Sequence, residues 1–145
     1  DGKHLTQPDP EGMEQVMRLA LESTGLVPDA IGYVNAHATG TVAGDIAESR
    51  GSFAVFGGST PVSSLKGHIG HTLGASGALE AWISIEMMRE GWFAPTLNLD
   101  VVDERCAPLD YVRGEPRSLR AEYVMSNNFA FGGINTSLVF RRWSE

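Results

Sequence analysis

The chain has 145 residues, 42% of them hydrophobic, which fits one domain with a core of its own. Its formal net charge of −7 argues against a nucleic-acid-binding protein, which would need a basic face. A single cysteine excludes a disulfide framework, and no apolar run approaches the roughly 18 residues of a membrane-spanning helix. No signal peptide is recognisable, and we expect a cytoplasmic protein.

The first predicted element is a helix over residues 9–25. Asp9 can cap it, and Pro10 suits its first position. Apolar residues recur in this segment with a 3.6-residue period, and Gly25 is a typical helix stop.

Strands and helices alternate through the rest of the chain. We expect a strand at 31–36, a helix at 44–56, a strand at 60–65, a helix at 72–90, and strands at 123–127 and 135–140. The helix at 72–90 is apolar on most of its sides, which predicts a central, buried helix. The alternation predicts an α/β fold with a mixed sheet and helices on both faces.

Three glycine-rich motifs lie near the ends of these strands: VNAHATGT at 34–41, SSLKGHIGHTLGA at 63–75 and SNNFAFGGIN at 126–135. His37 and His71 each follow a predicted strand, where open α/β sheets bind ligands. Two neutral imidazole N–H groups around one thioester carbonyl would stabilise an enolate. The alternative is two structural histidines bound to backbone carbonyls.

A lysine and a glutamate accompany the second motif. Glu80 is embedded in the apolar helix, and a buried carboxylate needs a partner, for which Lys66 is the obvious candidate. The pair is either structural or controls the charge state near the histidines, and both interpretations stay open. His68 and His71 are three residues apart, but no carboxylate or cysteine stands at ligand spacing, so no metal site is predicted.

Two threonines follow the first histidine at alternating positions. The hydroxyls of Thr39 and Thr41 could therefore line one side of a tunnel and donate to an amide carbonyl. They could equally form a turn in which the hydroxyls bind the backbone.

The third motif places two aromatic residues beside a double glycine. Phe129 and Phe131 next to Gly132 and Gly133 indicate either a hinged loop that carries a gate or two core aromatics beside a tight turn. Cys106 lacks the strand-turn-helix context of a nucleophile, so we do not expect it to be catalytic.

In combination, these motifs resemble the C-terminal half of β-ketoacyl-acyl carrier protein synthases, the condensing enzymes of fatty acid and polyketide synthesis. The resemblance covers nearly all of the chain. It implies a thiolase-like fold, in which two similar α/β halves pack as αβαβα layers. Residues 1–145 would be the C-terminal half, and the nucleophilic cysteine would belong to an N-terminal half outside this sequence. The chain opens with Asp1 rather than Met, which fits that expectation.

The resemblance also implies a reaction, the decarboxylative Claisen condensation of a malonyl group on its carrier with an acyl thioester. By this resemblance, His37 and His71 would promote malonyl decarboxylation and stabilise the enolate, and Lys66 with Glu80 would support them. Thr39 and Thr41 would bind the phosphopantetheine arm. Phe131 would act as a gate, together with Phe129, Gly132 and Gly133. The chain by itself would be an inactive part of an acyltransferase.

The implied partners are an acyl carrier protein, the N-terminal half, and a second synthase subunit in a homodimer or heterodimer. No cofactor is expected on this chain, because the carrier protein brings the phosphopantetheine arm. Ala38, Gly40, Ala130 and Ile134 depart from the residues usual in the family. Two alternatives remain: a non-catalytic, chain-length-determining partner subunit, and a stand-alone binding or dimerisation module.

Overall fold

The computed structural model describes residues 7–143 and contains a five-stranded mixed sheet. The strand order is β4-β2-β1-β6-β7, with β4 at Asp110–Tyr111, β2 at Pro61–Ser63, β1 at Ile31–Asn35, β6 at Tyr123–Ala130 and β7 at Ile134–Arg141. The first four of these pair in parallel, and β7 is antiparallel to β6. A separate antiparallel pair joins β3 (Trp92–Phe93) to β5 (Arg117–Ser118). The predicted mixed α/β sheet is confirmed.

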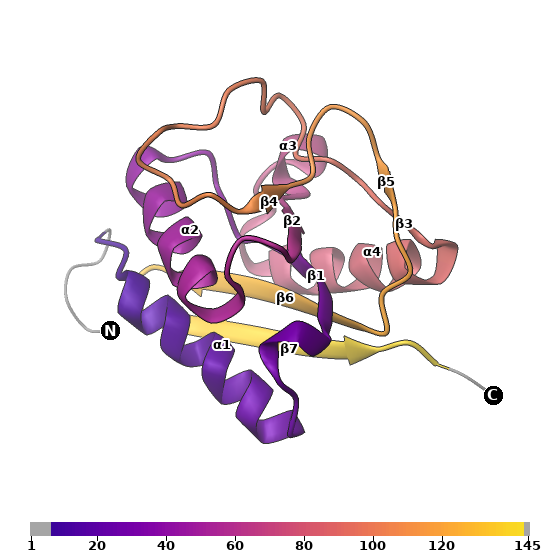
Figure 1. Ribbon diagram of the computed structural model, residues 1–145. Helices are drawn as coiled ribbons and strands as arrows, with labels where there is room; N and C mark the ends of the chain where they lie inside the picture. The colour runs from indigo at the N-terminus through magenta and orange to yellow at the C-terminus, as the bar shows by residue number, and fades with distance from the viewer. Residues whose placement is uncertain (1–6, 144–145) are drawn as a thin grey trace.

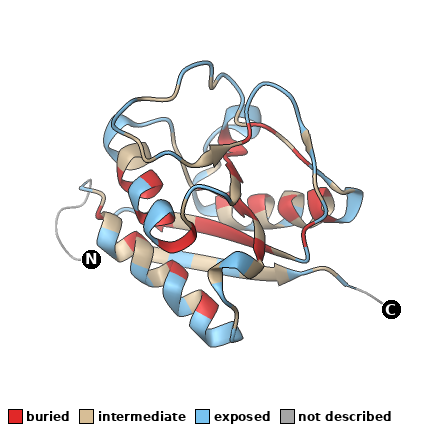
Figure 2. Ribbon diagram, in the orientation of Figure 1, coloured by how far each residue is buried: buried red, intermediate tan, exposed pale blue. Residues whose placement is uncertain are grey.

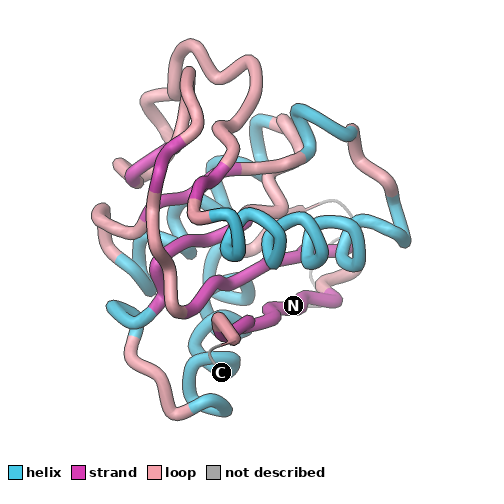
Figure 3. Tube along the Cα trace, turned by 90° about the vertical axis from the view of Figure 1, so that its right-hand side faces the viewer, coloured by secondary structure: helices cyan, strands magenta, loops and turns pink. Residues whose placement is uncertain are grey.

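Helices cover both faces of the sheet, as predicted (Figures 1 and 3). Helix α1 (Pro10–Thr24) and helix α2 (Val42–Phe56) pack on one face, and helix α4 (Ser76–Glu90) lies on the other. Three shorter helical turns complete the set: η1 at Pro28–Ala30, α3 at Lys66–Ile69 and η2 at Leu73–Ala75. Within residues 7–143, no helix has the length and apolar character needed to cross a bilayer.

Helix α1 forms as its sequence predicts. Pro10 occupies the first turn, and Asp9 is the N-cap residue, although its side chain makes no capping hydrogen bond. Gly25 ends the helix in the left-handed conformation, with φ at 68°, which glycine adopts without steric cost. The buried stripe of Met13 and Met17 faces the sheet and α2.

Two apolar cores lie on opposite faces of the sheet, because successive side chains of a strand point in opposite directions. Val34 and Met125 pack into the core under α1 and α2. Tyr33 and Val124, their neighbours in sequence, pack into the core under α4. Figure 2 shows this burial concentrated along the central strands. The central strands β1 and β6 are therefore buried on both sides.

The long helix differs from the prediction in two ways. It begins at Ser76 rather than residue 72, because α3 and η2 occupy the preceding segment. Within the described residues it is also buried on one face only: Glu80 and Ser84 lie on the inner face, whereas Trp82 is 60% exposed. Because apolar residues are spread around the whole of α4, its sequence does not show which face meets the sheet. The sheet of this chain covers only one face of the helix.

The segment between the last two strands is shorter than expected. Strand β6 continues to Ala130, and β7 begins at Ile134. Residues 131–133 therefore form a tight turn in a β-hairpin rather than a long loop. Gly132 and Gly133 both adopt φ values of 78°, a conformation that favours glycine.

Several of the C-terminal arginines are paired on the surface. Exposed or partly exposed ion pairs join Arg105 to Asp103, Arg117 to Asp110 and Arg141 to Glu122. These carboxylates neutralise much of the local positive charge. These arginines therefore belong to a surface of mixed charge.

Candidate functional site

The fold brings His37 and His71 together from positions 34 residues apart in sequence. Strand β1 ends at Asn35, and His37 lies in the loop that leads to α2. His71 follows α3, so this short helix separates it from β2, whereas the sequence had suggested a position directly after that strand. The two ring centroids are 5.4 Å apart, with the rings nearly perpendicular. The edge of the sheet thus carries two facing imidazoles.

Local backbone geometry sets the proton position on His71. The backbone N–H of Leu73 donates to His71 Nδ1 over 3.0 Å, and the Ser76 hydroxyl lies 3.3 Å from the same atom. Leu73 reaches this position with a φ of 53°, in the left-handed region that leucine rarely adopts. Because an N–H can only donate, Nδ1 must accept, and the neutral ring carries its hydrogen on Nε2. His71 therefore offers an Nε2–H donor.

His37 is held in its neutral form. Burial lowers its pKa to about 4, helped by the positive charge of Lys66 and by His71, while a hydrogen bond with the Asn128 side chain acts in the opposite direction. Its Nδ1 is buried and has no hydrogen-bond partner among residues 7–143. The ring also contacts the edge of Phe129, with centroids 6.1 Å apart. Near neutral pH His37 can therefore act as an uncharged hydrogen-bonding group.

The lysine and glutamate predicted as a pair do form one. Lys66 Nζ lies 2.5 Å from Glu80 Oε1, and the two side chains are 4% and 0% exposed. Asn128 donates to the other carboxylate oxygen over 3.4 Å. This buried pair places a fixed positive charge close enough to His37 to affect its pKa.

Two carboxylates that the sequence reading missed anchor the loop between β1 and α2. Glu48 accepts the backbone N–H groups of His37 at 2.8 Å and Ala38 at 2.6 Å, and Asp45 accepts that of Gly40 at 3.2 Å. Burial raises the pKa of Glu48 to about 7, against the lowering effect of those N–H groups. The sequence shows Asp45 and Glu48 three residues apart in the predicted helix, but it does not show that their carboxylates bind the preceding loop.

The histidines open into a pocket of about 800 Å³. Thr39 and Thr41 line it, with their hydroxyls 3.1 Å apart, as expected for residues on one side of a channel. Phe129 lines it from strand β6 and is buried, whereas Phe131 projects from the hairpin turn and is 74% exposed. Gly133 also lies at the pocket wall. The pocket thus combines two imidazoles, two hydroxyls and an exposed aromatic residue.

Three predicted positions do not line this pocket. Lys66 and Glu80 lie behind the histidines as a buried pair, and Gly132 sits at the tip of the hairpin turn. Cys106 lines a different cavity, in keeping with the expectation that it is not catalytic. No group of three or more potential metal-ligating side chains occurs in the part of the chain that the structure describes.

Fold and site together define an α/β protein that presents two imidazole groups at the carboxyl edge of a mostly parallel sheet. Such donors, fixed in place before a reaction, can stabilise negative charge that develops on a carbonyl oxygen. The hydroxyls beside them can bind an amide-containing chain. This is the chemistry of acyl transfer and enolate formation.

Comparison with known proteins identifies the family. Residues 1–100 match the model of the β-ketoacyl synthase C-terminal domain. The chain belongs to the β-ketoacyl synthase family, as its motifs had suggested. It is 44% identical, over 98% of its length, to 3-oxoacyl-[acyl-carrier-protein] synthase 2 of Coxiella burnetii, of which it covers 35%. The chain thus spans about a third of the curated relatives it matches.

Solved structures of the family share the fold. A β-ketoacyl synthase from Burkholderia phymatum is 62% identical with a TM-score of 0.98, and the match covers 99% of this chain and 35% of that one. A type II polyketide ketosynthase solved with its acyl carrier protein is 28% identical with a TM-score of 0.93, over 99% and 36% of the two chains. The thiolase-like fold is therefore confirmed.

Proposed function

We propose that this chain forms the decarboxylating side of the active site of a β-ketoacyl-acyl carrier protein synthase. The observation that carries the proposal is the pair of facing histidines in one pocket, with His71 Nδ1 saturated by a backbone N–H. His37 is uncharged near neutral pH, and His71, with Nδ1 accepting the Leu73 N–H, presents Nε2–H to the pocket. The site is thus suited to stabilise an enolate.

In the proposed reaction, a malonyl thioester enters on the phosphopantetheine arm of a carrier protein, and Thr39 and Thr41 bind the arm. The bond to the malonyl carboxylate breaks, carbon dioxide leaves, and the electron pair forms an enolate. Hydrogen bonds from His37 and His71 stabilise its oxygen. The enolate carbon then attacks an acyl thioester on a cysteine of the N-terminal half, a carbon–carbon bond forms, and the thiolate leaves.

The remaining roles follow from position. Lys66, held by Glu80, keeps a positive charge near His37 and so favours its neutral form. Phe131, on a turn with two left-handed glycines, would gate entry. The proposed partners are an acyl carrier protein, the N-terminal half and a second synthase subunit, in the cytoplasm. The chain would need no cofactor of its own.

The retention of every proposed catalytic group favours an enzyme over a chain-length-determining subunit. His37, His71 and Lys66 are all present and form one connected site. A subunit without a catalytic role would be under no constraint to hold two facing imidazoles at a pocket.

The test is malonyl-carrier decarboxylation by the intact protein with His37→Ala and with His71→Ala. We expect each variant to lose about 100-fold to 1,000-fold in rate, the usual effect of removing one such donor. His68→Gln is the matched control, because His68 lies in the same motif but binds the Pro95 carbonyl instead of lining the pocket. Wild-type decarboxylation by both alanine variants would refute the proposal.

A further inference from the structure

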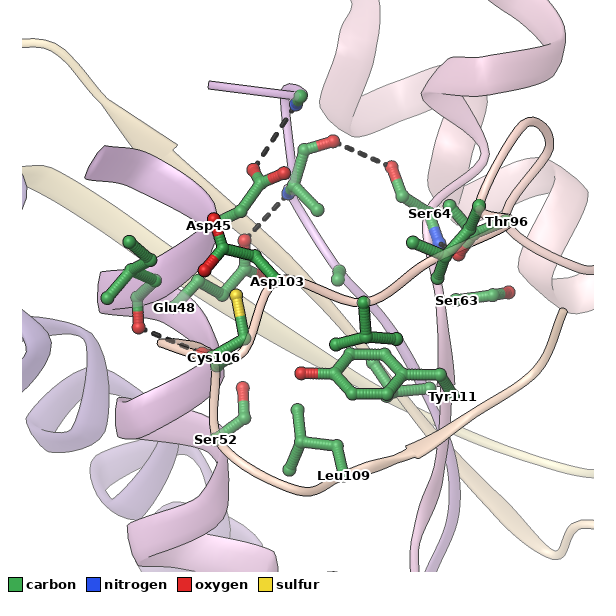
Figure 4. A pocket seen from close by; sticks show the side chains of 18 of the residues that line it. Asp45, Glu48, Ser52, Ser63, Ser64, Thr96, Asp103, Cys106, Leu109 and Tyr111 are labelled. Atoms are coloured by element: carbon green, nitrogen blue, oxygen red, sulfur yellow. Dashed lines mark hydrogen bonds between the residues drawn. The ribbon is translucent and has the colours of Figure 1, made fainter. Parts of the chain in front are cut away.

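A second cavity, of about 230 Å³, lies between helix α2, strand β2 and the connection at residues 96–106, which we call the strap. Figure 4 shows its lining, with Glu48 and Ser52 on the helix side and Tyr111 and Leu109 opposite. It shares Thr41 and Glu48 with the lining of the histidine pocket and is otherwise lined by different residues. The proposed reaction leaves it without a role.

The lining defines the chemistry of a ligand. Its walls are largely apolar, and the ring of Tyr111 offers a face on which an aromatic ring can stack. Three carboxylates, those of Asp45, Glu48 and Asp103, line it, whereas no lysine, arginine or histidine of the described residues does. Asp103 is paired with Arg105 on the surface, but the carboxylates of Asp45 and Glu48 bind backbone N–H groups and would repel an anion. Because a dry cavity of about 150 Å³ can hold benzene, this one has room for a substituted single ring.

The strap closes the cavity, and hydrogen bonds hold the chain near both of its ends. At one end the Thr96 hydroxyl accepts the backbone N–H of Ser64 at 3.0 Å. At the other, the Ser49 hydroxyl accepts that of Ala107, also at 3.0 Å. Between these ties, Val101 is 83% exposed and lines the cavity. Val42 of α2, 61% exposed, also lines it, so two exposed apolar side chains offer a way in for an apolar molecule.

The cavity shares a wall with the proposed active site. The loop between β1 and α2 turns His37 and Thr39 toward the histidine pocket. The alternate residues Ala38 and Gly40 line the strap cavity. The Ser64 hydroxyl, on the cavity side, donates to the Ala38 carbonyl at 2.9 Å. A bound ligand that displaces Ala38 would therefore also displace the adjacent backbone of His37.

We propose that the strap cavity is a binding site for a small, uncharged, single-ring aromatic molecule, and that its occupancy shifts the loop that positions His37. The binding half of this proposal stands apart from the proposed condensation. A ligand can bind here whether or not the histidine pocket decarboxylates malonyl groups.

The test uses fluorobenzene as the probe and Cys106, which lines the cavity, as the reporter. The intact protein is alkylated with iodoacetamide, and peptide mass spectrometry follows the modification of Cys106 separately from any other cysteine. We expect fluorobenzene at about ten times its dissociation constant to slow alkylation about tenfold. The anion 4-fluorobenzoate, matched in size to a substituted ring, should give no protection.

Two surface variants locate the effect. Val101→Trp places a bulky side chain at the cavity mouth, and Val27→Trp is the matched control, since Val27 is 65% exposed and lies outside the cavity lining. Titration of fluorobenzene by ¹⁹F NMR should show weaker binding to Val101→Trp than to Val27→Trp. Equal binding to both variants, or equal alkylation of Cys106 with and without fluorobenzene, would overturn the site.

A separate NMR measurement tests whether binding in the strap cavity shifts the loop that carries His37. The ¹³C-labelled ring of His37 is observed by NMR, and we expect its signal to move when fluorobenzene is added to the wild-type protein or to Val27→Trp, but not to Val101→Trp. Protection of Cys106 without any movement of the His37 signal would overturn the coupling to the loop. Loss of decarboxylation in the histidine variants bears on neither measurement.

Discussion

Removing the charge of Lys66 should change two measurable properties at once. In Lys66→Met, the carboxylate of Glu80, which is fully buried, loses its ion-pair partner. An uncompensated buried charge of this kind costs about 3–5 kcal/mol of stability. The double variant Lys66→Met with Glu80→Leu removes both charges, and its stability should return close to that of the wild type, because well-packed apolar pairs replace buried ion pairs at little cost.

The second property is the pKa of His37. Burial is the largest cause of its low value of about 4, and the charge of Lys66 is the next. Without that charge the protonated ring is less disfavoured, so the pKa of His37 should rise. It should remain below the ordinary value for histidine, because the burial is unchanged.

The assay is an NMR titration of the His37 ring in the wild type, in Lys66→Met and in the double variant, with thermal unfolding measured on the same samples. The double variant is the important control, because it is expected to fold as the wild type does while it still lacks the lysine charge. An unchanged or lower His37 pKa in that variant would refute the electrostatic role. It would leave the pair purely structural.

Two further predictions concern the supports of the site. Glu48→Gln should lower the decarboxylation rate, because the loop loses a charged acceptor for two N–H groups, and it should also flatten the pH dependence of stability. The pKa of Glu48 is raised from 4.5 to about 7, so its ionisation should cost the wild type stability as pH rises through that window, and thermal unfolding between those values checks this. Gly67→Ala should destabilise the protein by about 1–3 kcal/mol, because the added methyl would lie 3.0 Å from the Leu97 carbonyl oxygen. Gly74→Ala, with open space at the same point, is its control in denaturant unfolding, and equal losses in the two would contradict the steric reasoning.

Much of the architecture could be predicted from the sequence, because it depends on patterns within single segments. Pro10, an apolar stripe and Gly25 define α1 without reference to the rest of the chain. The placement of His37 just after a buried strand follows in the same way. The pairing of Lys66 with Glu80 could be predicted because a charge inside an apolar helix leaves few alternatives.

Other features depend on which segments meet, and no local pattern contains that information. The approach of His37 to His71 results from the pairing of β1 with β2 and from the turn of α3 after it. The anchoring of the loop between β1 and α2 by Glu48 requires α2 to fold back beside the strand that precedes it. The motifs suggested that the two histidines share a site, but residue spacing gave neither their separation nor the contacts of Glu48.

The sequence by itself determined the α/β class, most of the element positions and the set of chemically capable side chains, because periodicity and motif composition act over a few residues. Only the tertiary structure decided how those side chains are used. It selected the tautomer of His71 through a strained Leu73 and lowered the pKa of His37 by burial. Each of these depends on the distances and the burial that packing creates, and these quantities exist only once distant segments are in contact.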